Sequence, residues 1–449
     1  MADSRMAVHP SRGAWIAGGV LAGVGILQRV LLWLGYPPVN YGDTGTYFRL
    51  AGVVGRWTLK GYDGTRVPGY PAFVALAGSE PRVVYALQLG LGVAISLLLF
   101  WMALRTTHSV ALSLLLGLLY DLIPGQFLFE ANLIAETLTA FLLALSLALL
   151  AGLQHARSTA SDAAWAVSLG VASALVGLVR PLFFYLPVWL LFFLWNRRNG
   201  QRRLILRLSA FCFGPALLLG GWLWFIYSTY GMLSPTVLSG YGLIQHTGSY
   251  FEYLPDSAAP IRDTYVRLRD ERVAERGDQT NTIWDAIPEL SAASGLGFYD
   301  LSREIQRLSI RLICEHPVWY ARSVAEGWVD FWKAPVYWKP EAVESAGVRA
   351  ALGAWATAGR ALSLAANAPF LLASAAALVL PKVRKRLGVD AHLMAAAGTV
   401  WIGSVVQTLA DHGDNPRFLV PAQMLVFYVV VRMAYASWRS MRRSEAGAA

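Results

Sequence analysis

Charged residues are scarce in this chain of 449 residues, where Asp, Glu, Lys and Arg together make up only 15%. A soluble globular domain usually contains about 25% charged residues and about 45–50% apolar ones. Here 56% of the residues are hydrophobic and the mean hydropathy is +0.45. The low charge argues against a soluble domain, and the high apolar content argues against intrinsic disorder. The composition therefore predicts a membrane protein.

Cysteine and the common catalytic signatures are also rare or missing. The two cysteines, Cys212 and Cys314, lie in an apolar run and in a polar segment, so we expect no structural disulfide. The chain contains no HExxH, no paired CxxC, no GxGxxG that opens a helix after a strand, and no GxxxxGK[ST]. Zinc peptidase, dinucleotide-binding and P-loop chemistry are therefore not indicated.

What the chain does contain is a series of long apolar runs. About 20 helical residues cross a hydrocarbon core of about 30 Å. Runs near this length occupy residues 14–34, 82–104, 108–123, 133–153, 164–179, 182–195, 205–230, 354–380, 391–410 and 417–436. They predict an all-α, polytopic membrane protein with about ten transmembrane helices, between nine and twelve, in one membrane domain over residues 1–449. The two short runs within 164–195 are either two spans or one broken helix.

The basic residues are distributed unevenly between the connections of these spans, and their excess makes the net charge +10. With ten spans, one side of the membrane receives both termini and Arg5, Arg12, Arg105, Arg157, Arg197, Arg198, Arg202, Arg203, Arg207, Lys382, Arg384, Lys385, Arg386, Arg439, Arg442 and Arg443. Opposite them, the short connections 121–132 and 411–416 have no Lys or Arg. Because positive charge favours the cytoplasmic side, we predict cytoplasmic termini in a bacterial inner (plasma) membrane. The net positive charge is then explained by the orientation of the protein in the membrane. Nucleic acid is therefore not an expected partner.

Two longer segments, 35–81 and 231–353, then face outward. The segment 231–353 carries most of the acidic residues. Ile305, Leu308 and Leu312 recur there at helical spacing, which predicts an amphipathic helix lying on the membrane surface.

In the segment 35–81, Asp43 lies just beyond the first predicted span, in a turn flanked by glycines. Tyr47, Leu50, Ala51 and Val54 follow at helical spacing, so Asp43 would stand at or near the start of a helix. Asp is a common N-cap residue, and capping is one interpretation of Asp43. A catalytic carboxylate is the other.

Several short phrases resemble a known family. They are Asp43 with its following helix, RVPGYP at 66–71, NLIAETL at 132–138, EHPVWY at 315–320 and GDNPRFLVP at 413–421. Together they resemble the GT-C glycosyltransferases, and more narrowly the branch with protein mannosyltransferases and the aminoarabinose transferase of lipid A. The resemblance runs through most of the chain, although each phrase is short.

The resemblance implies an inner-membrane glycosyltransferase that moves a sugar from a polyprenyl-phosphate donor to an acceptor at the outer face, by inverting direct displacement. A positioned carboxylate can take the proton of the acceptor hydroxyl, and Asp43 is the predicted base. Guanidinium groups can bind the leaving phosphate. The predicted substrate-binding residues are Tyr47, Arg66, Glu136, Arg180 and Arg417. The acceptor would be a glycolipid, a wall polymer or a protein.

Most of these residues also have a structural interpretation. Arg66 could extend to the lipid headgroups, and Arg180 could mark an interfacial turn. Glu136 could be a helix N-terminal carboxylate that the helix dipole favours. Arg417 could pair with Asp411 or Asp414. His316, before Pro317, is interpreted as a residue at a helix start.

Three further possibilities remain open. Asp43 and a second carboxylate could bind a divalent cation, Mg²⁺ or Mn²⁺, although the first loop lacks an Asp-x-Asp pair. A transporter or flippase of lipid-linked sugars would place charged residues deep in several spans, whereas here the candidates gather at span ends. An O-antigen ligase or polymerase-like enzyme would use a pyrophosphate-linked glycan instead.

Overall fold

The computed structural model describes residues 11–154, 158–195, 200–413 and 415–446. Within these ranges the regular elements are helices, apart from an isolated bridge between Val39 and Asn132. Eight helices are long and apolar enough to cross a membrane, and a ninth span results if α5 (Val110–Leu122) is joined to the segment Pro124–Ala131, bent by 59°. The predicted class, an all-α polytopic membrane protein, is confirmed. Arg5, Arg157, Arg197, Arg198 and Asp414 lie outside the described residues.

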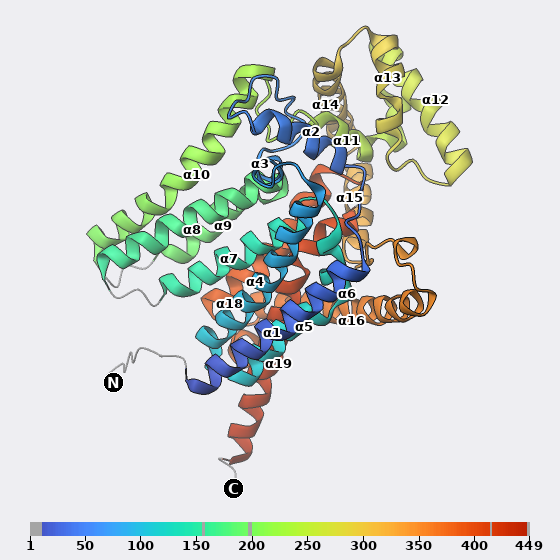
Figure 1. Ribbon diagram of the computed structural model, residues 1–449. Helices are drawn as coiled ribbons and strands as arrows, with labels where there is room; N and C mark the ends of the chain where they lie inside the picture. Colours follow the sequence, from blue (N-terminus) through green and yellow to red (C-terminus); the bar gives the residue numbers. More distant parts are fainter. Residues whose placement is uncertain (1–10, 155–157, 196–199, 414, 447–449) are drawn as a thin grey trace.

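The long helices form one bundle, in which α4 packs against α1, α5 and α7, and α8 packs between α7 and α10 (Figure 1). The long helices are α1 (Arg12–Gly35), α4 (Pro81–Thr107), α7 (Glu136–Leu153), α8 (Thr159–Val179), α10 (Gln201–Tyr230), α16 (Ala346–Val379), α18 (Ala391–Ala410) and α19 (Val420–Ala446). Glycines permit a close approach between α8 and α10. A Cβ atom on Gly170 would lie 2.0 Å from the backbone oxygen of Phe211, so only glycine fits at this crossing.

The segment 164–195 is divided at Arg180. α8 is a full-length helix, whereas the apolar segment Pro181–Leu194 is shorter and consists of η2 (Pro181–Tyr185), α9 (Leu186–Leu191) and η3 (Phe192–Leu194). The backbone of Arg180 is extended, with φ −142°, because a residue before proline is disfavoured from helical geometry. The corner therefore places the Arg180 side chain at the end of α8.

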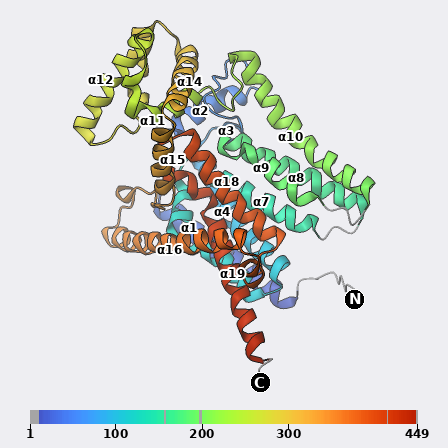
Figure 2. The same ribbon diagram turned by 180° about the vertical axis from the view of Figure 1, so that it is seen from behind.

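A cluster of shorter helices caps one end of the bundle (Figures 1 and 2). It consists of α11 (Ser239–Thr247), α12 (Ala259–Arg276), α13 (Thr282–Ser294) and α14 (Phe298–Glu315), and α15 (Pro317–Phe331) connects it to the bundle. The predicted amphipathic helix is α14, but its apolar residues Ile305, Leu308 and Leu312 are buried against α11 in a small core. The expected position of this face on the membrane surface is wrong, because the cluster itself buries it.

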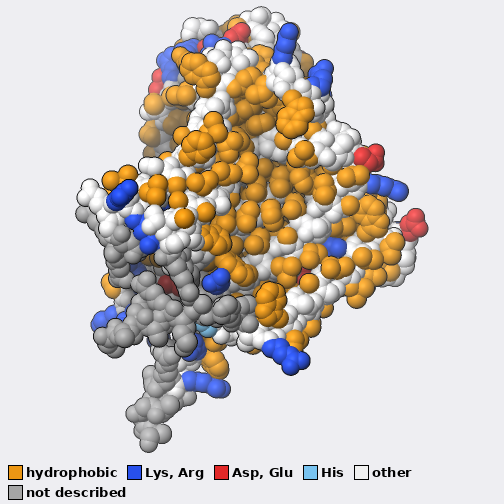
Figure 3. All heavy atoms as spheres, turned by 60° about the vertical axis from the view of Figure 1, so that its left-hand side comes forward, with side chains coloured by type: hydrophobic (Ala, Val, Ile, Leu, Met, Phe, Trp, Pro, Cys, Tyr) orange, Lys and Arg blue, Asp and Glu red, His pale blue; other side chains and the backbone are white. Residues whose placement is uncertain are grey.

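The two ends of the bundle carry most of the charged side chains of the face seen in Figure 3. Hydrophobic side chains cover the middle of one face, and charged side chains lie mainly toward its two ends (Figure 3). We call the end with α2 (Thr44–Val54) and the α11–α14 cluster the Asp43 end. The opposite end, where α1 begins and α19 finishes, is the tail end (Figure 1). Cys212 and Cys314 are free, as expected.

Candidate functional site

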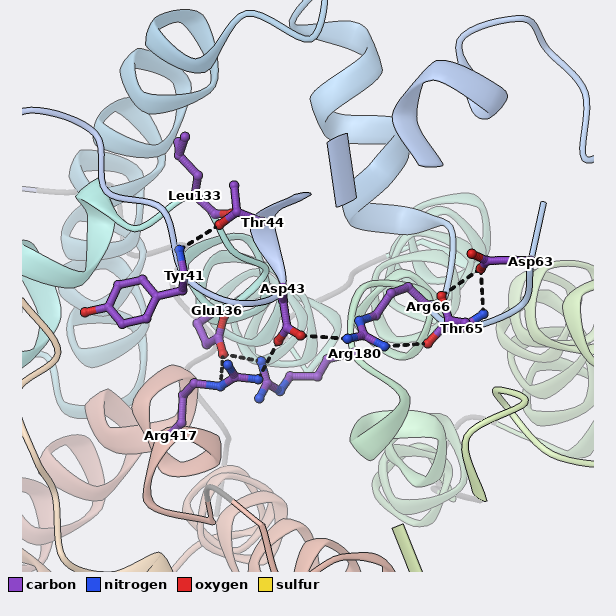
Figure 4. Close-up of polar contacts among 10 residues, drawn as sticks. All are labelled: Tyr41, Asp43, Thr44, Asp63, Thr65, Arg66, Leu133, Glu136, Arg180 and Arg417. Atoms are coloured by element: carbon purple, nitrogen blue, oxygen red, sulfur yellow. Dashed lines mark hydrogen bonds and ion pairs between the residues drawn. The ribbon is translucent and has the colours of Figure 1, made fainter. Parts of the chain in front are cut away.

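The loop that carries Asp43 is fastened to the segment just before α7. The backbone N–H of Val39 donates to the oxygen of Ala131 (2.8 Å), and the N–H of Leu133 donates back to Val39 (2.9 Å). The hydroxyl of Thr44 donates to the oxygen of Leu133 (3.0 Å). These bonds hold Asp43 over the N-terminus of α7 (Figure 4).

Asp43 occupies the N-cap position of α2, but its side chain makes no capping hydrogen bond. Its Oδ1 atom accepts a hydrogen bond from Arg66 Nη2 (2.6 Å), and its Oδ2 atom accepts one from Arg417 Nη2 (2.8 Å). The capping interpretation is therefore wrong. The carboxylate is used to hold two arginines that come from distant parts of the chain.

Glu136 lies in the first turn of α7 and is buried. Its Oε1 atom is 2.5 Å from Arg180 Nη1 and 3.1 Å from Arg417 Nε. Arg417 thus bridges the two carboxylates, and Figure 4 shows the side chains of Asp43, Arg66, Glu136, Arg180 and Arg417 converging. We call this group the Asp43 site.

The turn before Arg66 has its own local support. Asp63 Oδ1 accepts the backbone N–H (2.9 Å) and the hydroxyl (2.7 Å) of Thr65, and Arg66 Nη1 donates to the oxygen of Thr65 (2.9 Å). The ring of Tyr47 lies beneath, with its centroid 6.0 Å from Arg66 Cζ. Tyr47 is buried, so it supports Arg66 from below.

Arg180 is the most enclosed of the three arginines, with 5% of its side chain exposed. Its Cζ atom lies 4.2 Å from the centroid of the Phe418 ring. Within the described part of the chain, its Nε and Nη2 atoms have no hydrogen-bond partner. Buried donors without acceptors are unfavourable, so these two atoms of Arg180 remain available to an additional acceptor.

The ionisation of Asp43 follows from its partners. Burial raises the pKa of Asp43, but the ion pairs with Arg66 and Arg417 outweigh burial and hold the pKa well below its usual range. Burial raises the pKa of Tyr47 to about 12, so its phenol stays neutral. In this arrangement Asp43 is an anion at neutral pH and a weak base as long as both arginines hold it.

The other sequence candidates lie around this group. Asp411, a proposed partner of Arg417, accepts the N–H of Gly413 (2.9 Å), and burial raises its pKa to about 6. The alternative partner Asp414 lies outside the described residues. His316 precedes α15 and stacks on Trp319 with ring centroids 4.2 Å apart, in agreement with a role at the helix start.

The sequence leaves open whether Asp43 and a second carboxylate bind Mg²⁺ or Mn²⁺. In residues 11–154, 158–195, 200–413 and 415–446, no group of three or more His, Cys, Asp or Glu side chains could hold a metal ion. Both carboxylate oxygens of Asp43 already accept hydrogen bonds from arginine, and this donor set does not fit a cation as arranged. Mg²⁺ or Mn²⁺ binding stays a prediction of the sequence.

Sequence reasoning missed several residues that shape the site. Phe418, which covers Arg180, follows directly after Arg417, but nothing in its type or spacing marks that role. Asp63 had a usable signal, because Asp two residues before a Thr is typical of an Asx turn. Buried ion pairs beneath the site, formed by Arg29 with Asp121 and Glu130, were also missed.

Comparisons with known proteins give a limited result. No protein-family model matches the chain, and no curated protein matches it. Among solved structures, the chain is similar to the crystal structure of ArnT from Cupriavidus metallidurans bound to undecaprenyl phosphate, at 15% identity and a TM-score of 0.40, covering 94% of this chain and 78% of that one. For ArnT from the same organism in the apo state, the identity is 13%, the TM-score 0.37 and the coverage 93% and 77%.

Proposed function

We propose that the Asp43 site binds the phosphate of a polyprenyl-phosphate-linked sugar and transfers the sugar to an acceptor hydroxyl. The observation that carries this proposal is the convergence of three guanidinium groups on one place. Arg66, Arg180 and Arg417 meet there around the carboxylates of Asp43 and Glu136. A phosphodiester donor carries one negative charge, which guanidinium groups bind by charge-assisted hydrogen bonds. The unpaired donors of Arg180 supply hydrogen bonds for the same group.

The total charge of the site and its ligands is conserved through the reaction. The acceptor oxygen forms a bond to the anomeric carbon, the bond from that carbon to the phosphate oxygen breaks, and the phosphate keeps the electron pair. The acceptor proton passes to Asp43, which becomes neutral as the phosphate gains its second negative charge. The total charge of site and ligands is unchanged, so the arginines stabilise the leaving group without a net cost to the site.

Donor binding would also activate the base. Arg66 and Arg417 have exposed fractions of 24% and 18%, so a ligand can reach them. A phosphate that draws hydrogen bonds from these two arginines weakens their hold on Asp43. The proton affinity of Asp43 then rises toward that of an ordinary carboxylate, which suits a general base. Glu136, which is buried, keeps Arg180 and Arg417 in place.

The proposal extends to the setting of the enzyme. The protein lies in a bacterial inner membrane with cytoplasmic termini, since basic residues gather at the tail end. The Asp43 end then faces outward, and the α11–α14 cluster covers the site where the acceptor binds. The prenyl chain lies between the spans in the bilayer. Acceptors of this class are a glycolipid, a wall polymer or a protein.

The test is sugar transfer by the purified full-length protein in nanodiscs. A panel of undecaprenyl-phosphate sugars is offered with extracted envelope acceptors, and donor consumption is followed by mass spectrometry. Asp43→Asn is expected to lower the rate by about 10²–10⁴-fold, the range for loss of a general base. Donor consumption by the wild type with no effect of Asp43→Asn would remove Asp43 from the role of base.

Asp300→Asn is the matched control. Asp300 lies in α14 at the same end of the bundle, pairs with Arg303 (2.9 Å) on the exposed surface and is not part of the Asp43 site. It should keep most of the activity. If the wild type moves donors across the membrane without consuming them, the transporter alternative holds instead.

A further inference from the structure

A polar cavity lies at the tail end, far from Asp43. It has a volume of about 580 Å³, within the range of pockets that bind small ligands. It is formed by the end of α4, by α17 (Pro381–Arg386) and by the second half of α19. Gly388, with φ +60°, lets the turn after α17 approach α19, where an added Cβ atom would lie 2.8 Å from Ala436.

The lining of this cavity is strongly basic. It includes Lys385, Arg386, Arg432 and Arg439, with hydroxyls from Thr106, Thr107 and Ser440, and it includes no Asp or Glu. Arg432 is neutralised by Asp390, which lies 2.8 Å away. No ion pair within the described chain holds Lys385, Arg386 or Arg439, so three positive charges face the cavity uncompensated.

The level of the cavity in the bundle favours a lipid ligand. It lies where α4 and α19, two helices apolar enough to span a membrane, reach their ends. Two tryptophans lie near these helix ends. Arg105 Cζ is 5.0 Å from the centroid of the Trp101 ring, and Arg442 Cζ is 4.5 Å from that of Trp438. Tryptophan is enriched where membrane helices meet the headgroups. A ligand in the cavity is therefore beside the phosphates of the lipid leaflet.

We propose that this cavity is a binding site for the headgroup of an anionic phospholipid. The phosphodiester would lie among Lys385, Arg386 and Arg439, and the hydroxyls of Thr107 and Ser440 would bind the polar end of the headgroup. The acyl chains would run toward the exposed apolar side chains of Leu378, Val379 and Leu380, which directly precede α17. Basic pockets at the ends of membrane helices recognise anionic headgroups by this combination of charge and position. The site is independent of the sugar-transfer proposal.

The experiment is native mass spectrometry of the purified full-length protein in detergent, with phosphatidylglycerol as the probe. The pocket variant combines Lys385→Ala, Arg386→Ala and Arg439→Ala. The control variant combines Arg12→Ala, Lys382→Ala and Arg442→Ala, which removes the same charge from exposed positions at the tail end but outside the cavity. We expect the wild type and the control to retain phosphatidylglycerol at least about tenfold better than the pocket variant.

Two further arms identify the ligand. Phosphatidylethanolamine should be retained equally weakly by all three proteins, and inorganic phosphate at the same concentration should not displace phosphatidylglycerol. A photoactivatable phosphatidylglycerol should label α17 or the second half of α19 in the wild type, a result that does not depend on how the variants fold. Equal retention by the pocket and control variants, displacement by inorganic phosphate, or labelling elsewhere would each overturn the proposal.

Discussion

Two clusters of arginines and carboxylates lie close to the Asp43 end, and they differ in both charge and exposure. The Asp43 site brings together three arginines and the carboxylates of Asp43 and Glu136, and its Asp43, Arg66 and Arg417 side chains are 20%, 24% and 18% exposed. In the second group, which we call the Arg29 cluster, one arginine faces Asp121 and Glu130, and their exposed fractions are 4%, 0% and 0%. The Asp43 site is partly open and holds two unpaired donors of Arg180 among the described residues, whereas the Arg29 cluster is closed and holds one arginine between two carboxylates.

The contacts of the Arg29 cluster show what a closed arrangement does. Arg29 Nε and Nη2 donate to the two oxygens of Glu130 (3.0 and 2.6 Å), and Nη1 donates to Asp121. Gln88 Nε2 donates to the backbone oxygens of Glu130 (2.7 Å) and Asn132 (2.9 Å). The cluster thus fixes the segment that leads into α7 and supports the Asp43 loop. A closed cluster secures the scaffold, and an open one with spare donors can bind a ligand.

The largest expected effect is on the free energy of unfolding. Replacing one arginine in each cluster should show which cluster stabilises the fold and which is free to bind a ligand. Arg29→Met leaves two fully buried carboxylates without a cation, and breaking a buried ion pair costs about 3–5 kcal/mol. Arg180→Met leaves Glu136 paired with Arg417 at 3.1 Å, so the loss of stability should be much smaller. Thermal denaturation of the purified proteins, monitored by tryptophan fluorescence, measures both effects.

Donor binding should instead be weakened by the replacement in the Asp43 site. Arg180→Met should fold and weaken binding of an undecaprenyl-phosphate sugar about 10–100-fold, since a hydrogen bond to a charged group contributes about 1.5–3 kcal/mol. Equal thermal stability of Arg29→Met and wild type would show that the Arg29 cluster does not secure the scaffold. Unchanged donor affinity in Arg180→Met would remove Arg180 from the phosphate site.

A smaller effect is expected from adding one methyl group beside the closed cluster. A Cβ atom on Gly92 would lie 2.1 Å from Glu130 Oε1, and Glu130 cannot retreat because Arg29 holds both of its oxygens. Gly92→Ala should therefore lower stability by about 1–3 kcal/mol, the usual cost of overpacking. Gly90→Ala is the control on the same helix, since nothing lies within 4 Å of its added Cβ. Equal melting temperatures for the two variants would contradict the tight packing of Glu130.

The sequence allowed the open site to be predicted better than the closed one. Asp43, Arg66, Glu136, Arg180 and Arg417 stand out because each is a charged residue at the edge of an apolar run, and the structure brings them together. Their pairing could not be predicted, because Asp43 and Arg417 are separated by most of the chain. Tertiary packing alone decides that Asp43 holds arginines instead of capping α2.

The Arg29 cluster illustrates why the rest was missed. Arg29 lies within an apolar helix, and Asp121 and Glu130 lie in a connection with no basic residue, so no local pattern links them. The amphipathic spacing of α14 was recognised, but spacing shows only that one face is apolar and not what covers it. In the structure the α11–α14 cluster covers that face. Helices were predictable from composition, whereas their partners depend on contacts between distant segments.

The smallest expected effect concerns the ionisation of the open site. Because the folded pKa of Asp43 lies below the unfolded value of about 3.9, its ion pairs stabilise the protein fully above that value and lose their effect as the pH falls toward the folded pKa. The wild type should therefore melt above Asp43→Asn by an amount worth roughly 1 kcal/mol at pH 5–8, and the difference should shrink between pH 5 and pH 3. Asp300→Asn, which breaks an exposed pair with Arg303, should differ little from the wild type at any pH. A difference for Asp43→Asn that stays constant between pH 5 and pH 3 would mean that packing, and not charge, holds the Asp43 site together, and the two clusters would then not differ in kind.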